Sequence, residues 1–411
     1  MEELFVRPWA RARMHDGPLG THIDAFIGRL ANQGYAKATL RRAAWLLGDF
    51  SRWLTGRGLA ADGITREGIE AFLRHRKRRR TPRYEDRPTL LRLLTHLGDS
   101  GIVVLTAPAP LPSPAQRLAT EYVDYLRWER NLAPSTIHTH RQDAKRLLAA
   151  LFGEGEVDVA RMTAQEVVAH VLQVTQACGP ATAKRVAGGL RAFLRFAYHR
   201  GLIGTDLSQS IPAPAHWSLS SIPRALDADH VRGILAHCDR TTANGRRDYA
   251  IILLLARLGL RAGEVAALRL EDIDWRAGEL RIRNGETRID RLPMPPDVGE
   301  ALAMYLREAR PPCPSRHVFV RAQAPRQGFA SGTAIAGIVR RALGRAGLNP
   351  PSQGAHALRH ALATQLLRDG ASLAEIGEVL RHRRQRTTLI YAKVDLAALR
   401  PLATPWPGGG Q

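Results

Sequence analysis

Two proline-rich segments limit how this chain can fold. One runs from Pro108 to Pro114 and the other from Pro212 to Pro223. Proline fixes φ and lacks a backbone donor, so such stretches separate packed elements. A chain of 411 residues is also too long for one hydrophobic core. We therefore expect three units, at residues 1–107, 115–210 and 222–411.

Apolar spacing predicts that the fold is mainly α. Side chains such as Ile23, Phe26, Ile27 and Leu30 recur every three or four residues in the first two units, as on one face of a helix. The third unit adds a hairpin, with strands at 279–283 and 287–292 flanking the turn signal Asn284-Gly285. The expected fold is two helical bundles followed by an α+β domain with a small β-sheet.

The first two units look like an internal duplication. Each matched segment opens a long helix, caps a helix or closes one. The matched pairs are 35–40 with 132–137, 64–67 with 162–165, and 90–102 with 190–202.

The charge of the chain favours a polyanionic partner. There are 60 Lys and Arg against 38 Asp and Glu, a formal charge of +22, which attracts nucleic acid and makes binding depend on salt. The run 74–80 is either a solvated helix end or a surface that contacts phosphates. The candidate DNA contacts are Arg74, Arg76, Lys77, Arg78, Arg79 and Arg80, with Lys145 and Lys184 in the second unit.

Other classes of protein fit the sequence poorly. Residues 1–20 carry charges and prolines instead of the apolar core of a signal peptide. No apolar run approaches the roughly 20 residues that span a bilayer. Cys178, Cys238 and Cys313 are isolated and odd in number, which indicates reduced thiols in a cytoplasm rather than a disulfide framework or a metal site.

The third unit holds the residues that suggest chemistry. The apolar run from Asp248 to Leu258 predicts a buried helix broken at Gly259, followed by Arg261 and, three residues later, Glu264. Residues 251–274 form the first box. Further along come the second box, His356-Ala-Leu-Arg359-His360, the third box, Leu380-Arg381-His382-Arg383, and then Tyr391. Paired arginines can clamp a phosphodiester, histidines can move protons near neutral pH, and a tyrosine can attack phosphorus.

These boxes, in this order and spacing from Ile222 to Trp406, resemble the tyrosine recombinase (phage integrase) family. The resemblance implies a site-specific DNA recombinase that cuts and rejoins strands through a 3′-phosphotyrosyl intermediate, without metal or nucleotide cofactor. It implies that Tyr391 is the nucleophile. Arg261 and Arg359 would stabilise the phosphoryl oxygens, and His356 and His382 would assist protonation and position the phosphate. Glu264 and His360 would support them.

The resemblance also implies partners and a location. The second unit is similar to the helical core-binding domain, and the first would add a contact to DNA or to a subunit, or serve only for packing. The expected partner is double-stranded DNA. We expect a homotetramer on two recombination sites, or a hetero-assembly with related recombinases. No membrane partner is expected, and the location implied is cytoplasmic, prokaryotic and associated with the nucleoid.

One departure from the family leaves alternatives open. The family usually carries a lysine in the hairpin turn, at a position that falls near Gly285 here. Arg288 or Arg283 could replace its charge, but a guanidinium with a pKa above about 12 is a poor general acid. A catalytically attenuated DNA-binding subunit is therefore one alternative. A type IB topoisomerase-like enzyme is another, although the duplicated module argues against it.

Overall fold

The computed structural model divides into two compact units, residues 1–105 with 221–411, and residues 106–220. Buried apolar side chains form separate cores within residues 4–103, 118–211 and 226–358. The described residues are 4–5, 7–79, 81, 83–103, 114–153, 157–213, 225–284, 288–394 and 399.

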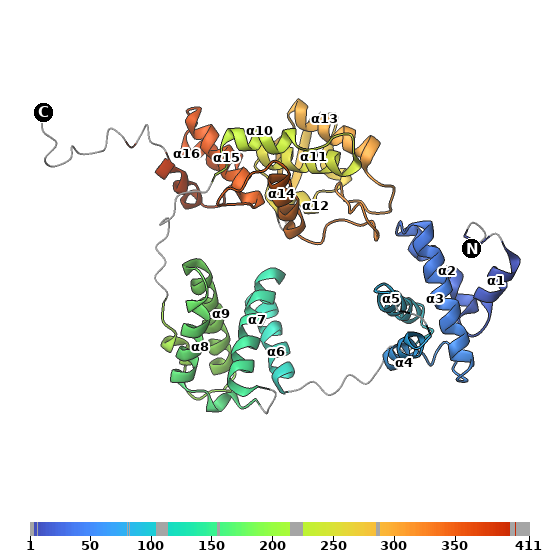
Figure 1. Ribbon diagram of the computed structural model, residues 1–411. Coiled ribbons are helices and arrows are strands. Elements are labelled where there is room, and N and C mark those ends of the chain that lie inside the picture. Colours follow the sequence, from blue (N-terminus) through green and yellow to red (C-terminus); the bar gives the residue numbers. More distant parts are fainter. Residues whose placement is uncertain are drawn as a thin grey trace, which may run out of the picture. The chain divides into compact units, whose positions relative to one another are not determined.

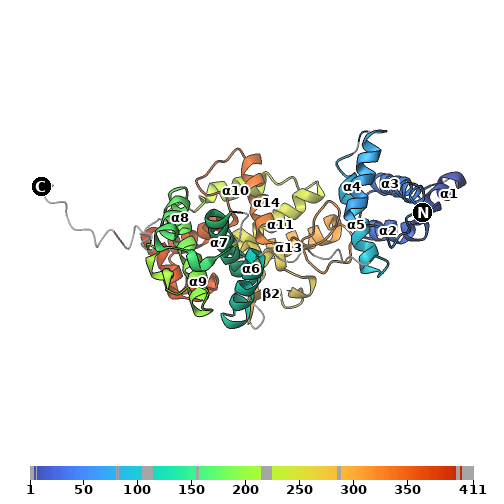
Figure 2. The same cartoon turned by 90° about the horizontal axis from the view of Figure 1, so that it is seen from below.

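The amino-terminal bundle is helical, with α2 and α3 packed together (Figures 1 and 2). Its core contains leucine, isoleucine and phenylalanine side chains at helical spacing, as the sequence predicts. The helices are α1 (Pro8–His15), α2 (Gly20–Asn32), α3 (Lys37–Thr55), α4 (Arg66–Lys77) and α5 (Asp86–Asp99).

The middle bundle is also helical, and α7 packs along α9 (Figure 1). A π-helical turn, η1 (Tyr125–Glu129), extends its first helix, and the 3₁₀ helices η2 (Val159–Arg161) and η3 (Leu207–Ser210) lie in its connections. The α-helices are α6 (Pro114–Asp124), α7 (Pro134–Phe152), α8 (Ala164–Gln176) and α9 (Pro180–His199).

Local structure in the two bundles follows the predicted duplication. Helices α3 and α7 both have 19 residues, and each begins two residues before its matched threonine, Thr39 or Thr136. Thr65 and Thr163 cap α4 and α8 in the same way. Matched glycines with positive φ, at +70° and +68°, follow α5 and α9. The corresponding sequences therefore begin and end their helices alike.

The carboxy-terminal part combines helices with a three-stranded antiparallel sheet in the order β1-β2-β3. Its α-helices are α10 (Ala228–Ala236), α11 (Ala243–Arg257), α12 (Ala262–Ala267), α13 (Pro296–Met304), α14 (Gly332–Arg345), α15 (Ala355–Arg368) and α16 (Leu373–Val379). Its strands are β1 (Ile273–Asp274), β2 (Glu279–Asn284) and β3 (Arg288–Pro293). Its remaining short helices are η4 (Leu270–Asp272), the π-helical η5 (Tyr305–Ala309) and the 3₁₀ helix η6 (Gln385–Val394).

The predicted hairpin forms, and its pairing runs from Glu279 opposite Pro293 to Asn284 opposite Arg288. Residues 285–287, which include the predicted turn position Gly285, lie outside the described residues. The expected fold class, mainly helical with a small sheet, is confirmed.

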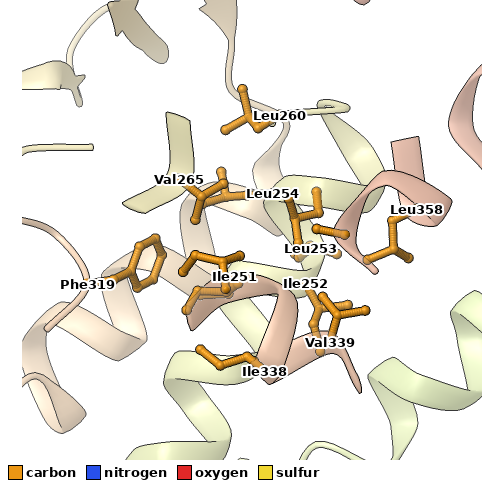
Figure 3. Close-up of a cluster of buried hydrophobic side chains, with 14 of the residues drawn as sticks. Ile251, Ile252, Leu253, Leu254, Leu260, Val265, Phe319, Ile338, Val339 and Leu358 are labelled. Carbon is orange, nitrogen blue, oxygen red and sulfur yellow. The ribbon is translucent and has the colours of Figure 1, made fainter. Parts of the chain in front are cut away.

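Helix α11 is the centre of the carboxy-terminal core (Figure 3). Its side chains Ile251 to Leu255 are buried on all sides, because α13, α14 and α15 all pack against this helix. A helix that is apolar around its whole circumference belongs in an interior. This rigid helix leads directly into the turn that carries Arg261. Among the described helices, none is long and apolar enough to cross a membrane.

Candidate active site

The first box depends on a glycine turn after α11. Gly259 has φ of +56°, which disfavours a side chain. A Cβ atom there would lie 2.7 Å from Leu380 Cδ2. The turn places Arg261 just before α12. Glu264 then holds Arg261 twice, because its carboxylate accepts from the Arg261 backbone N–H at 2.8 Å and from Nη1 at 2.7 Å.

Arg359, the arginine of the second box, is a buried connector. It is the fifth residue of α15, and 3% of its surface is exposed. Its Nη1 donates to the Gly259 carbonyl and its Nη2 to the Leu380 carbonyl, so it ties the first box to the third. Burial lowers the pKa of Arg359 to about 10, and the side chain therefore stays cationic at neutral pH.

The two histidines of the second box differ in position. The His356 surface is exposed, and its ring centroid is 5.6 Å from that of His360. The surrounding protein atoms, followed by the charges of Arg359 and Arg261, lower the pKa of His356. His356 is thus the more accessible of the pair and is neutral near pH 7.

The Tyr391 hydroxyl forms a hydrogen bond with His360. Its Oη lies 2.9 Å from His360 Nδ1, and Tyr391 is only 2% exposed. Burial raises the pKa of Tyr391, although the charge of Arg359 opposes the shift. Burial, followed by the charge of His356, lowers the pKa of His360 to about 4. A neutral His360 can therefore accept the Tyr391 proton in a hydrogen bond.

The third box follows α16 and supplies His382. Its backbone N–H donates to the Gly377 carbonyl at 2.9 Å, and its Nδ1 lies 2.8 Å from Thr388 Oγ1. Its ring is parallel to that of Tyr391, with centroids 6.5 Å apart and 4° between the planes. Burial, followed by the charge of Arg359, lowers the pKa of His382 to about 4. His382 is therefore also neutral at pH 7.

The structure brings the predicted residues together, but some of their contacts differ from the expected roles. His360, expected to be a supporting residue, contacts the Tyr391 hydroxyl directly. Thr388 and Arg381 were not singled out from the sequence, yet one bonds to His382 and the other to Glu264. The sequence signal for Arg381 is its place between Leu380 and His382, but it is hidden in a run of basic residues.

The two candidate lysine substitutes occupy different surroundings. Arg283 donates both Nε and Nη2 to Oδ1 of the buried Asp272, at 3.0 and 2.7 Å. Arg288 donates to Asp290 at 2.7 Å and lines a hollow of about 480 Å³ together with Arg381 and His382. This position favours Arg288 over Arg283 as a charge at the site.

The candidate DNA-contacting residues differ in exposure and in their ion pairs. Arg76 is an internal residue, since it pairs with Asp49 at 2.7 Å and Asp86 at 3.4 Å. Arg80 lies outside the described residues. The others are exposed and able to contact a phosphate: Arg74, Lys77, Arg78, Arg79, Lys145 and Lys184.

Two family models match this chain, one over the carboxy-terminal part and one over the middle bundle. Residues 224–397 match the model of the phage integrase family. Residues 119–201 match the model of the phage integrase N-terminal SAM-like domain.

Individual relatives extend the match over the whole chain. A putative integrase/recombinase of Sinorhizobium fredii, y4rA, is 43% identical over 404 residues, which are 98% of each chain. Tyrosine recombinase XerD of Mycobacterium tuberculosis is 29% identical and matches 70% of this chain and 95% of its own.

Solved structures share the fold. XerH site-specific recombinase, bound to a palindromic difH substrate in a post-cleavage complex, aligns with a TM-score of 0.55 at 16% identity. The alignment covers 72% of this chain and 98% of that one. The family models and the curated relatives show that the chain belongs to the phage integrase family of tyrosine recombinases, enzymes that transfer DNA strands.

Proposed function

We propose that this recombinase cleaves duplex DNA with Tyr391 and uses His360 as the acceptor of the tyrosine proton. The contact between His360 Nδ1 and Tyr391 Oη, at 2.9 Å, carries the proposal. A phenol with a raised pKa is a weak nucleophile unless a base takes its proton during attack. His360 is within hydrogen-bond reach and neutral, as that role requires.

The proposed step conserves atoms and charge. Tyr391 Oη forms a bond to phosphorus while the bond from phosphorus to the 5′-oxygen breaks. The phenolic proton passes to His360, and the departing 5′-oxygen takes up a proton from solvent water. The product is a 3′-phosphotyrosyl strand with a free 5′-hydroxyl strand. Attack by the 5′-hydroxyl of a partner duplex reverses the step and joins the strands.

The arginines and the remaining histidines have different roles in this proposal. Arg261 is 38% exposed along its side chain and is directed to the phosphate by Glu264. Its fixed charge stabilises the oxygens of the transition state, usually the largest contribution in such transfers. Arg359 is buried between two carbonyls and holds the boxes in register. To His356 and His382 we assign the positioning of the phosphate.

The burial of Tyr391 implies an opening step. A side chain with 2% exposure cannot meet a phosphate in this arrangement. The segment η6 must shift before attack, and bound DNA or a neighbouring subunit would supply the driving contacts. We propose that the active form is a homotetramer on two duplex sites. Several recombinases of this fold have been solved on DNA, including lambda integrase as a dimer and as a tetramer.

The decisive experiment uses Tyr391→Phe, which removes one oxygen atom. A nicked duplex from the DNA flanking the gene traps the covalent complex, because the short cleaved strand diffuses away. Wild type should form a protein–DNA adduct that survives denaturation, and Tyr391→Phe should bind the DNA but form none. Tyr249→Phe, in the same part of the chain, is the matched control and should form the adduct. An adduct with Tyr391→Phe would show that another residue is the nucleophile.

A further inference from the structure

Arg381 is a buried arginine for which the mechanism above has no use. Its side chain is 4% exposed, and its backbone has φ of +55°. This left-handed conformation favours glycine, and arginine rarely adopts it. The backbone at this position therefore does not explain the residue. The contacts of the guanidinium provide the explanation.

The guanidinium of Arg381 shares the carboxylate of Glu264 with Arg261. Glu264 Oε1 accepts from Arg261 Nη1 at 2.7 Å, while Oε2 accepts from Arg381 Nη2 at 2.9 Å. The Glu264 side chain is itself only 7% exposed. One buried carboxylate thus lies between two guanidinium groups, one buried and one partly exposed.

The sum of these charges matters for catalysis. If Glu264 faced Arg261 alone, the pair would be neutral, and its pull on a phosphate would be weak. Arg381 adds a second positive charge from the protein side, so the three groups together carry +1. Because the carboxylate is shielded from water, no solvent counter-ion can do this equally well.

We propose that Arg381 is a positioning residue that compensates the charge of Glu264. Glu264 can then hold Arg261 in place without cancelling the positive charge that Arg261 presents to the scissile phosphate. The inference rests on the proposed function, because it assigns Arg261 to that phosphate. It also explains how Glu264 Oε1 can lie 2.7 Å from Nη1 of Arg261, the arginine assigned to the phosphate.

The same guanidinium extends the chain of charges to the hairpin. Its Nε lies 3.9 Å from Asp290 Oδ2, and Asp290 Oδ1 accepts from Arg288 Nε at 2.7 Å. Charges of alternating sign therefore lead from Arg261 to β3 through Glu264, Arg381 and Asp290. Arg381 therefore links the loop before His382 to both the first box and the hairpin.

The test is a double-mutant cycle with Arg381→Gly and Glu264→Gln. Glycine fits the backbone, and glutamine keeps the shape of glutamate without its charge. Single-turnover cleavage at saturating nicked DNA should fall roughly 100-fold in Arg381→Gly, because Glu264 then neutralises Arg261. Adding Glu264→Gln should recover about tenfold or more of that loss, and Arg381→Lys should keep most of the activity. Arg383→Gly removes the same charge from an exposed position two residues away and should change the rate little.

A binding measurement separates this inference from the proposed chemistry. In a Tyr391→Phe background, neutral methylphosphonate linkages are scanned through the bound duplex, and affinities are compared with the natural phosphodiester. One position should show a preference of about tenfold for the anion. Arg381→Gly should remove that preference, and Glu264→Gln should restore it.

The outcomes are distinct. Failure of wild type to form any adduct would refute the proposed function, while the methylphosphonate preference could still support the role of Arg381. A double variant that stays as slow as Arg381→Gly, with both proteins folded by thermal melting, would overturn charge compensation. A methylphosphonate preference unchanged in Arg381→Gly would overturn it equally.

Discussion

The hydrogen bond between His360 and Tyr391 couples the proposed nucleophile to a titrating group. Both His360 and His382 have pKa values lowered to about 4 by burial, whereas an unfolded histidine titrates near 6.5. Between these values the unfolded chain binds more protons than the folded chain. The stability that these histidines contribute is fully present above pH 6.5 and is lost as the pH falls toward 4.

We therefore predict that acid destabilises the wild type more than a His360→Asn/His382→Asn variant. The measurement is the thermal unfolding midpoint at intervals from pH 7.5 to 4.5. The unfolding midpoint of the variant should fall less between pH 6.5 and 4.5, because the two asparagines cannot take up protons. His138→Asn, at an exposed histidine, is the control and should follow the wild type. Parallel curves for the wild type and the double variant would contradict the burial-driven shifts.

At the scale of elements, the hairpin is the part in which we expect this chain to depart from its family. Each of its described arginines pairs with a carboxylate: Arg281 with Asp274, Arg283 with Asp272, Arg288 with Asp290, and Arg291 with Glu279. Asp272 further raises the pKa of Arg283. These groups provide positive charge, but they release protons poorly. We therefore expect the described strands to offer no effective acid to the leaving 5′-oxygen of the proposed step.

This leads to a prediction about the leaving group. A 5′-bridging phosphorothiolate leaves as a thiolate and needs no proton, so it should be cleaved roughly 100-fold faster than the natural substrate. Arg288→Lys places an amine with a lower pKa on β3 and should speed cleavage of the oxygen substrate only. Single-turnover rates on both substrates provide the measurement. Equal rates in the wild type would mean that a competent acid lies elsewhere in the site.

At the scale of the whole molecule, the net charge of +22 should make DNA binding strongly dependent on salt. The structure indicates which charged side chains of the amino-terminal bundle are available to bind DNA. Arg76 is used internally by Asp49 and Asp86, whereas its basic neighbours on and after α4 are exposed. We propose that this exposed group tracks a DNA backbone and that the first bundle thereby enlarges the contact with DNA.

The corresponding prediction uses the full-length chain with Arg74, Lys77, Arg78 and Arg79 all changed to Gln. The slope of log affinity against log salt should become shallower by up to about four units, at roughly 0.9 per lost phosphate contact. Arg76→Gln is the control, which should lower the thermal unfolding midpoint and leave the slope unchanged. An unchanged slope in the fourfold variant would assign the first bundle to packing or to subunit contacts.

The sequence by itself determined the mainly helical fold, the hairpin and the family. Apolar periodicity reports which face of a helix is buried, and matched positions such as Thr39 and Thr136 report the repeat because helix starts are local. Gly259 could be placed at the end of the buried helix for the same reason. These features depend on neighbours a few residues apart.

Tertiary structure alone decided how the boxes work together. The partners of Arg359 are separated from it by 100 and 21 positions, and Arg381 and Glu264 by 117. No local pattern encodes such contacts, so the sequence could not show that Arg359 is a connector or that His360 contacts the Tyr391 hydroxyl. The carboxylate that Arg381 shares with Arg261 arises only where two distant segments pack together, and burial makes each charge there depend on its partner.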